Sequence, residues 1–119
     1  MNWYLSKMVF RIICGEGQHK AQFDEQLRLI QAGSKEEAFH KAQSLGMKSE
    51  ELFFNHRKQL VQWQFISVSE IYLLQELMDG AELYSRVEET EDAESYLKFV
   101  HAKAGQIRFG NSHEILNLA

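Results

Sequence analysis

Apolar and polar residues follow a period of two in the first part of the chain. Residues 3–14 have apolar side chains at almost every even position and at most odd ones, which predicts a strand covered on much of both faces. Residues 21–32 alternate apolar with polar side chains, a pattern typical of a strand with one face in water. Gly15 and Gly17 suit a turn, so the two segments are predicted to form an antiparallel hairpin.

The next segment has the signals of a helix start and a helix end. Ser34 and Glu37 form a capping box, in which each side chain can bond the backbone amide of the other residue. An apolar stripe follows at helical spacing and consists of Ala38, Phe39, Ala42 and Leu45. Gly46 stands where a left-handed residue commonly ends a helix. Residues 48–59 lack a clear period and are predicted as the least regular connection, either a loop or a short helix capped by Ser49.

A later run of strand-forming residues changes its apolar parity. The odd positions Trp63 and Phe65 are apolar first, and the even positions Ile66 and Val68 follow. A regular strand cannot change parity without turning over, because successive side chains point to opposite faces. We therefore predict a β-bulge between Phe65 and Ile66, and bulges often lie next to functional sites.

The last third of the chain predicts a second hairpin and a second helix. Asp79 and Gly80 form a turn signal, and residues 82–88 alternate again, as expected of a strand paired with the preceding one. Thr90 is predicted to cap a helix with acidic residues in its first turn. Its apolar stripe consists of Ala93, Tyr96, Leu97, Val100, Ala104 and Ile107. Residues 108–119 have too little periodicity to assign an element and are predicted as an irregular tail, with a short terminal helix at residues 114–118 as the alternative.

These elements predict the order β-β-α-β-β-α. The 119 residues fit one domain, so residues 1–119 are predicted as a single α+β domain. The expected architecture is a four-stranded, mainly antiparallel and twisted sheet packed with two amphipathic helices.

The composition limits the binding partners and the cellular compartment that we expect. The net charge of -4 gives no general attraction to nucleic acid, and only a local patch of Lys7, Arg11, Arg57 and Lys58 leaves that possibility open. Cys14 is the single cysteine, which favours a reducing compartment. No segment approaches the roughly 20 apolar residues needed to cross a bilayer, so we expect a cytoplasmic protein without membrane insertion.

Four blocks of the chain carry a family resemblance. They are residues 3–7 (WYLSK), residues 27–32 leading into 34–38, residues 61–65 with Ile71 and Tyr72, and residues 79–86. With these blocks the chain resembles a family of small bacterial proteins known as domain of unknown function number 4288. The resemblance implies no activity, cofactor or catalytic residue, and it is weakest beyond Glu88.

Six polar and aromatic residues on the predicted second hairpin form the candidate binding site. They are Trp63, Glu70, Tyr72, Glu82, Tyr84 and Arg86. If the strands pair, Arg86 could hold Glu70, or it could hold a ligand carboxylate or phosphate. A plain cross-strand salt bridge beside core aromatics is the favoured interpretation, because exposed ion pairs are common and contribute little.

No standard catalytic or metal-binding motif emerges. The five histidines, at positions 19, 40, 56, 101 and 113, stand at none of the short spacings that build a metal site locally. Cys14 ends an apolar strand, where a thiol behaves as a small hydrophobe. Gly15 and Gly17 lack the third glycine and the following helix of a dinucleotide loop. We therefore predict no catalytic residue, no metal and no cofactor.

The sequence favours a non-enzymatic interaction or regulatory module. Open sheet edges and surplus aromatic residues predict a protein partner or a homodimer, the aromatics being Trp3, Trp63, Phe53, Phe54 and Phe99. The alternative is a small hydrolase or ligand-binding protein that uses Glu70, Glu82 and Arg86 around an aromatic pocket.

Overall fold

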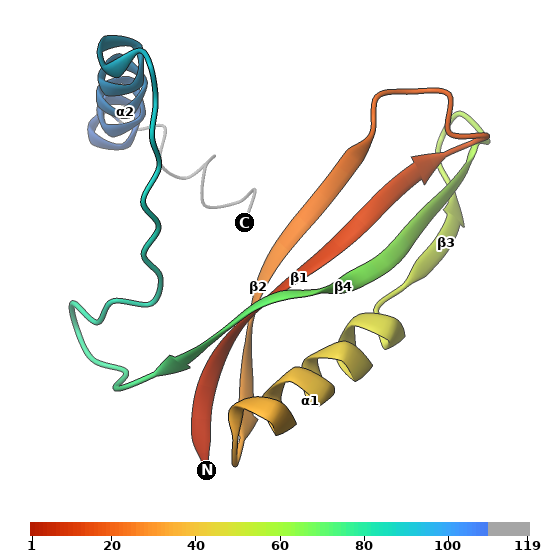
Figure 1. Ribbon diagram of the computed structural model, residues 1–119. Coiled ribbons are helices and arrows are strands. Elements are labelled where there is room, and N and C mark those ends of the chain that lie inside the picture. The colour runs from red at the N-terminus through yellow and green to blue at the C-terminus, as the bar shows by residue number, and fades with distance from the viewer. Residues whose placement is uncertain (110–119) are drawn as a thin grey trace. The chain divides into compact units, whose positions relative to one another are not determined.

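The computed structural model describes residues 1–109, and in this part of the chain four strands and two helices follow the order β-β-α-β-β-α (Figure 1). The elements are β1 (Asn2–Cys14), β2 (Gln22–Ala32), α1 (Lys35–Lys48), β3 (Glu51–Phe54), β4 (Leu60–Leu74) and α2 (Ala93–Arg108). The predicted α+β class and element order are thereby confirmed. The predicted tail falls almost wholly outside the described residues.

The second hairpin is formed by β4 and the strand that precedes it, and not by β4 and the segment that follows it, as predicted. Strand β3 lies in the stretch predicted to be irregular, and it pairs with the start of β4, antiparallel, from Glu51–Trp63 to Phe54–Leu60. Asn55 closes the turn between them, because its side-chain oxygen accepts hydrogen bonds from the amides of Arg57 and Gln59. The prediction of a strand at residues 82–88 was wrong, since that segment has no strand structure.

The turn signal that suggested the wrong hairpin is nevertheless a turn. Gly80 has a φ of 85°, and the Ala81 amide donates to the Met78 carbonyl at 2.9 Å. The residues that follow form no ladder with β4. A turn signal identifies a change of chain direction, whereas strand pairing also needs a free edge and a matching face.

All neighbouring strands in the sheet are antiparallel. The strand order is β2-β1-β4-β3, so the almost wholly apolar β1 is a central strand, as its pattern predicted. The sheet is long and strongly twisted, and α1 packs along one of its faces (Figure 1). We call this the helix face and the opposite one the open face.

The core lies between α1 and the even-numbered residues of β1. Tyr4, Met8 and Phe10 are buried there, and they contact two buried alanines of the helix, Ala38 and Ala42. The remaining buried members of the core cluster are Ile30, Ala32 and Val68. Phe39, Leu45, Trp63, Phe65 and Ile71 are partly buried and pack against them.

The predicted bulge in β4 is confirmed. Val9 of β1 lies opposite Ser67 and Phe10 lies opposite Phe65, so Ile66 has no partner on β1. A second bulge, which the sequence pattern did not reveal, leaves Ser69 without a partner between Val68 and Glu70. Each extra residue restores the apolar positions of β4 to the helix face.

Helix α1 begins as predicted and ends later. Ser34 accepts a hydrogen bond from the Glu37 amide at 3.1 Å, and the Glu37 carboxylate accepts one from the amide of Gly33 rather than that of Ser34. The helix continues to Lys48, so the prediction that Gly46 ends it was wrong. Gly46 is buried inside the helix, where a Cβ would overlap the Phe65 ring.

Helix α2 belongs to a second compact unit that begins at Arg86, whereas residues 1–85 form the first unit. Its N-cap is Asp92 and not Thr90 as predicted. The Asp92 carboxylate accepts hydrogen bonds from the amide and the hydroxyl of Ser95, at 3.0 and 2.6 Å. The packing of this helix on the sheet stays a prediction.

We expect the first turn of α2 to fray as the pH falls through the pKa of Asp92. Hydrogen bonds from Ser95 lower that pKa. Their contribution is therefore complete above the ordinary pKa of an unfolded aspartate, roughly 3.9, and is lost below the lowered value in the folded protein. Hydrogen exchange of the Ser95 amide across an acid titration measures this effect. Asp92→Asn, a comparably good cap, should remove the pH dependence, and an unchanged acid transition in that variant would contradict the assignment.

Neither helix within residues 1–109 combines the length and the apolar character needed to span a lipid bilayer.

Candidate functional site

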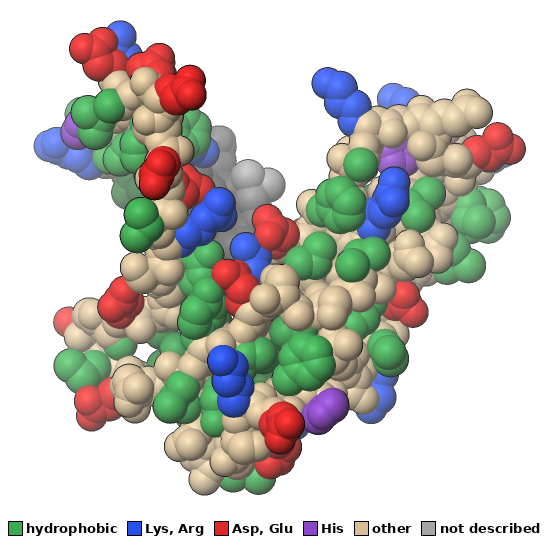
Figure 2. Space-filling model, in the orientation of Figure 1, with side chains coloured by type: hydrophobic (Ala, Val, Ile, Leu, Met, Phe, Trp, Pro, Cys, Tyr) green, Lys and Arg blue, Asp and Glu red, His purple; other side chains and the backbone are tan. Residues whose placement is uncertain are grey.

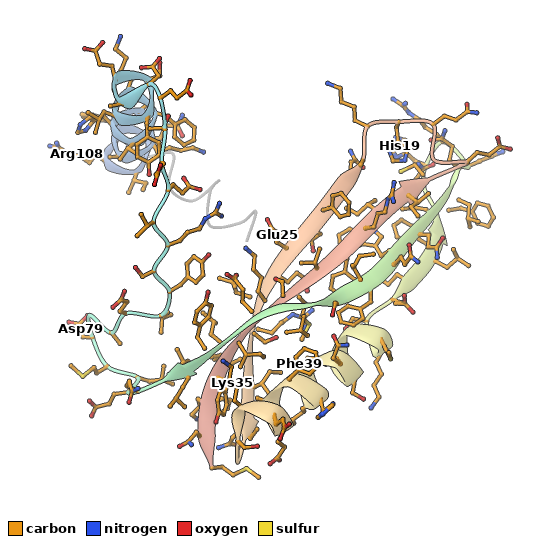
Figure 3. All side chains as sticks on the ribbon, in the orientation of Figure 1. His19, Glu25, Lys35, Phe39, Asp79 and Arg108 are labelled. Carbon is orange, nitrogen blue, oxygen red and sulfur yellow. The ribbon has the colours of Figure 1, made fainter. Side chains whose placement is uncertain are left out.

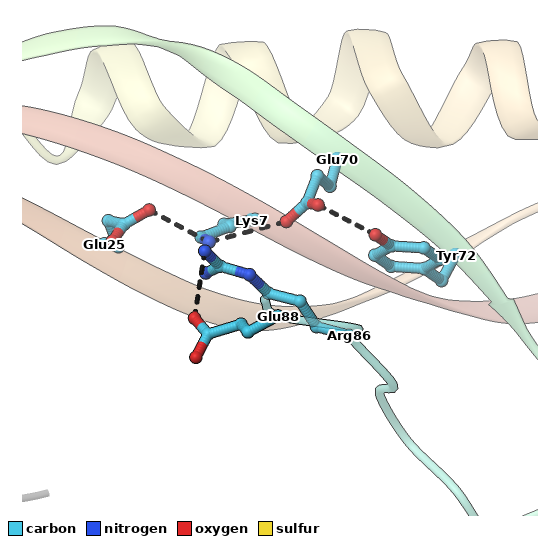
Figure 4. Close-up of polar contacts among 6 residues, drawn as sticks. All are labelled: Lys7, Glu25, Glu70, Tyr72, Arg86 and Glu88. Carbon is cyan, nitrogen blue, oxygen red and sulfur yellow. Dashed lines mark hydrogen bonds and ion pairs between the residues drawn. The ribbon is translucent and has the colours of Figure 1, made fainter. Parts of the chain in front are cut away.

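A polar network crosses the open face of the sheet, centred on Lys7 of β1. The register places Glu70 of β4 beside Lys7 on this face. The Lys7 ammonium nitrogen lies 2.9 Å from a carboxylate oxygen of Glu25 and 3.5 Å from one of Glu70 (Figure 4). Only 15% of the Lys7 side chain is exposed, so its charge needs these two partners.

Tyr72 extends the network along β4. Its hydroxyl donates to Glu70 Oε1 at 2.8 Å, and the ring of Tyr84 packs edge-on against its own ring at a centroid distance of 5.7 Å. The second carboxylate oxygen of Glu70 is buried and makes no hydrogen bond among the described residues. Its negative charge is instead balanced by Lys7, at a distance that is long for a hydrogen bond.

Two groups of the network, Lys7 and Tyr72, have raised pKa values. The hydrogen bond to Glu25 raises the pKa of Lys7, and the hydrogen bond to Glu70 raises the pKa of Tyr72. Both groups therefore keep their protons more tightly than usual and are protonated at neutral pH. A lysine or tyrosine that acts as a general base or nucleophile needs a lowered pKa, so the shifts of Lys7 and Tyr72 favour a structural or binding role for these two groups.

The six predicted site residues do not converge on one place. Glu70, Tyr72 and Tyr84 lie together on the open face. Trp63 lies on the helix face, where its ring packs 6.3 Å from that of Phe10. Among the described residues, Glu82 is exposed and makes no side-chain hydrogen bond or ion pair. Arg86 belongs to the second unit, in which its guanidinium lies 3.1 Å from Glu88 (Figure 4).

Sequence reasoning missed the centre of this network. The sequence pattern places Lys7 only in a scattered basic set, and it assigns no role to Glu25. A usable signal was present: a lysine in the middle of a central, largely apolar strand needs a counter-charge on a neighbouring strand. The pairing with two carboxylates also balances one charge of the proposed basic patch.

A groove of about 790 Å³ lies between β4 and the first turns of α1. Its apolar lining includes Phe39, Val68 and Ile71, and Lys35 and Glu36 of α1 contribute charged groups. Lys35 and Phe39 lie along α1 beside β4 (Figure 3). Residues 68–72 of β4, which include the second bulge, form the opposite wall.

The groove follows an unpaired edge of the sheet. Strand β3 pairs with β4 only from Leu60 to Trp63, so the rest of β4 has no strand on its outer side within the described residues. Two edge amides are capped by side chains: Phe65 N–H donates to Glu50 Oε2 and Val68 N–H to Gln43 Oε1, both at 2.9 Å. In the described part of the chain no side chain caps the amides of residues 69–74. The edge is therefore protected up to the point where the groove begins.

The described residues contain no cluster of three histidine, cysteine or carboxylate side chains that could hold a metal ion. His19 has a local role instead: its Nε2 accepts a hydrogen bond from the Cys14 amide at 3.0 Å, and its Nδ1 lies 2.7 Å from the Lys20 carbonyl. Nδ1 must then be the protonated nitrogen, which donates to that carbonyl. His113 lies outside the described residues.

A family model described as a domain of unknown function (DUF4288) matches residues 3–85. The chain belongs to this family. The resemblance noted in the sequence is thereby confirmed, and the match ends where the first compact unit ends. The DUF4288 region thus contains the whole sheet, α1, the polar network and the groove. No curated protein and no solved structure matches the chain.

Proposed function

We propose that this protein is a non-enzymatic interaction module that binds a partner protein by strand addition in the groove between β4 and α1. The observation that carries the proposal is the change along the β4 edge. The amides of Phe65 and Val68 are capped by side chains, whereas no side chain of the described residues caps the β4 amides beyond Val68, where the strand continues along the groove. An extended segment that adds to a sheet edge gains main-chain hydrogen bonds there.

The walls of the groove suggest what kind of segment binds. Phe39 and Ile71 are half-buried apolar groups that face a cavity, and they suit one large apolar side chain of the partner. Alternate residues of an added strand point to opposite faces, so the next side chain would lie over the open face near Tyr72. The expected ligand is an extended peptide with an apolar anchor.

We place this function in the cytoplasm of a bacterial cell. The family resemblance supports the bacterial source, and the single free cysteine, Cys14, supports a reducing compartment. The alternative of a hydrolase has less support, because Glu82, one of its expected residues, makes no side-chain hydrogen bond or ion pair within the described residues, and the raised pKa values of Lys7 and Tyr72 make both groups poor proton acceptors.

We expect a proline at Ser69 to abolish peptide binding. Peptides are selected from a random display library, and the best one is titrated into isotope-labelled protein. The amides of residues 69–74 and of the first turns of α1 should shift and become protected from exchange. Ser69 lines the groove and has no Cα partner on β1, so Ser69→Pro removes a main-chain donor there at a position outside the paired residues of the β1–β4 register, and affinity should fall about tenfold or more.

Ile66→Pro is the matched control. It also changes a bulged residue without a partner on β1, but it lies in the capped part of the edge. Its peptide affinity should equal that of the unmodified protein. Equal affinity in Ser69→Pro, or amide shifts confined to β2 or β3, would disprove binding at this groove.

A further inference from the structure

Strand β2 forms the other long edge of the sheet, and it lacks the usual protection of an edge. It is 11 residues long and pairs with β1 without a register shift. It contains no lysine and no proline between Gln22 and Ala32. Natural sheets protect long edges with bulges, prolines, charged side chains or covering segments, because an open edge pairs with other strands. The charged residues of β2 are Asp24, Glu25 and Arg28, and each is already bonded within its own chain.

The remaining edges of the sheet differ from β2 in this respect. Strand β3 is only four residues long. The β4 edge has two bulges, and its Phe65 and Val68 amides are capped by Glu50 and Gln43. Within the described residues, β2 is therefore the one long and regular edge, and the single side-chain cap on its backbone lies at its C-terminal end, where Lys41 of α1 donates to the Gln31 carbonyl at 2.8 Å.

The helix-face side chains of β2 form an ordered acid–amide–base row. Gln26 is at its centre: its amide nitrogen donates to Asp24 at 2.6 Å, and its amide oxygen accepts from Arg28 Nη2 at 2.8 Å. A strand that carries an acid on one side of its centre and a base on the other is complementary to an antiparallel copy of itself. A twofold axis at Gln26 places each acid opposite a base.

The open-face side chains of β2 are largely apolar and uncovered. Phe23, Leu27 and Leu29 are each more than half exposed. Their neighbour Glu25 has its charge balanced within its own chain, by Lys7 of β1 at 2.9 Å. Apolar side chains also reach the surface over the β3 end of the sheet, but the short β3 offers little edge for them to support (Figure 2).

From these observations we infer that two copies of this chain associate through antiparallel pairing of β2 with the partner's β2, with the twofold axis at Gln26. In this register Asp24 faces the partner's Arg28, and Phe23 faces the partner's Leu29. The two four-stranded sheets then form one continuous sheet. The contact lies on the opposite edge from the β4 groove, so it is independent of the peptide-binding proposal.

Neighbouring registers are less favourable. An axis at Glu25 or Arg28 would bring two like charges directly opposite each other, which is destabilising. An axis at Leu27 would place Asp24 opposite an isoleucine and Arg28 opposite a glutamine, so the acid–base pair is lost, while Glu25 faces a leucine in this register as it does in the one centred on Gln26. The register centred on Gln26 is the one that joins both the charged pair and the apolar pair.

Charge reversal tests the surface and the register. The unmodified protein should have about twice the 13.9 kDa chain mass in light scattering and should dissociate on dilution. Arg28→Asp, or Asp24→Arg, places like charges opposite each other twice per dimer and should raise the dissociation constant about tenfold or more. The double swap Asp24→Arg with Arg28→Asp should restore the dimer. Arg57→Glu, an equal change of charge in the β3–β4 turn, is the control and should leave association unchanged.

Cysteine cross-linking gives a second readout, used with Cys14→Ser to remove the native thiol. Gln26→Cys should form an intermolecular disulfide on mild oxidation, because the axis brings the two side chains face to face. Leu29→Cys should not, because it faces the partner's Phe23. A monomer at high micromolar concentration, a dimer insensitive to both single reversals, or equal cross-linking at positions 26 and 29 would each overturn the inference. Circular dichroism confirms that every variant is folded.

Discussion

Replacing Gly46 with alanine is expected to destabilise the first unit by about 2 kcal/mol. The added Cβ would overlap the ring of Phe65, which packs on Phe10 at a centroid distance of 5.5 Å. Inserting a methyl group into a packed core costs about 1–3 kcal/mol or more. Alanine regains up to about 1 kcal/mol of helix propensity, which offsets only part of that cost. Thermal unfolding should show a midpoint lower by about 10 °C.

Two further variants separate packing from helix propensity. Gly105 of α2 has nothing within 4 Å of the position of a Cβ, so Gly105→Ala should leave α2 as stable or slightly more stable. Phe65→Leu makes room beside position 46. In combination with Gly46→Ala it should therefore cost less than the sum of the two single changes. An unfolding midpoint unchanged by Gly46→Ala would show that α1 does not approach β4 this closely.

The first half of the fold was predictable because its signals are local. The period-two segments, the glycine turn and the Ser34 cap each depend on residues close together in the sequence, and all appear in the structure. Gly46 was misinterpreted because a glycine that permits close packing and a glycine that ends a helix look the same in sequence. Only the distance to Phe65, a residue far along the chain, distinguishes them.

The second hairpin was misplaced for a related reason. Strand β4 has turn signals at both ends, and the Asp79-Gly80 pair is the more familiar one. The actual turn uses the Asn55 side chain and a left-handed Lys58, whose φ is 60°, and neither is a strong signal. The candidate site followed the wrong hairpin. It therefore grouped Glu82 and Arg86 with Glu70. It omitted Lys7, which pairs with Glu70, and Glu25, which pairs with Lys7.

The groove could not be predicted because it depends on how far β3 extends. A longer β3 would cover the β4 edge, and a shorter α1 would leave the amides of Phe65 and Val68 without their caps. Both lengths are set by tertiary packing. The β2 edge is different, since its acid–amide–base row is visible in the sequence once β2 is known to be an edge strand.

Deleting Ile66 is expected to leave the fold intact, whereas deleting Val9, on the opposite strand, is expected to abolish it. Ile66 has no partner on β1 and is half exposed. Without it, Ser67 stays opposite Val9 and Phe65 stays opposite Phe10, so the ladder becomes regular and no side chain changes face. The cost should not exceed about 2 kcal/mol, the range of ordinary substitutions.

The deletion in β1 has the opposite effect because β1 is hydrogen-bonded on both sides. Val9 pairs with Glu25 of β2 and with Ser67 of β4. Removing it turns one half of β1 over, so that either Tyr4 and Met8 or Phe10 leaves the helix face. Each such side chain loses about 1.5–3 kcal/mol of burial free energy, and both ladders lose their register. The total stability of a domain is only about 5–15 kcal/mol, so these losses together are enough to unfold it. Near-ultraviolet circular dichroism and two-dimensional amide spectra should show a native protein for the Ile66 deletion and an unfolded one for the Val9 deletion. Equal behaviour of the two would mean that the extra residues of β4 are not what keeps its apolar side chains on the core.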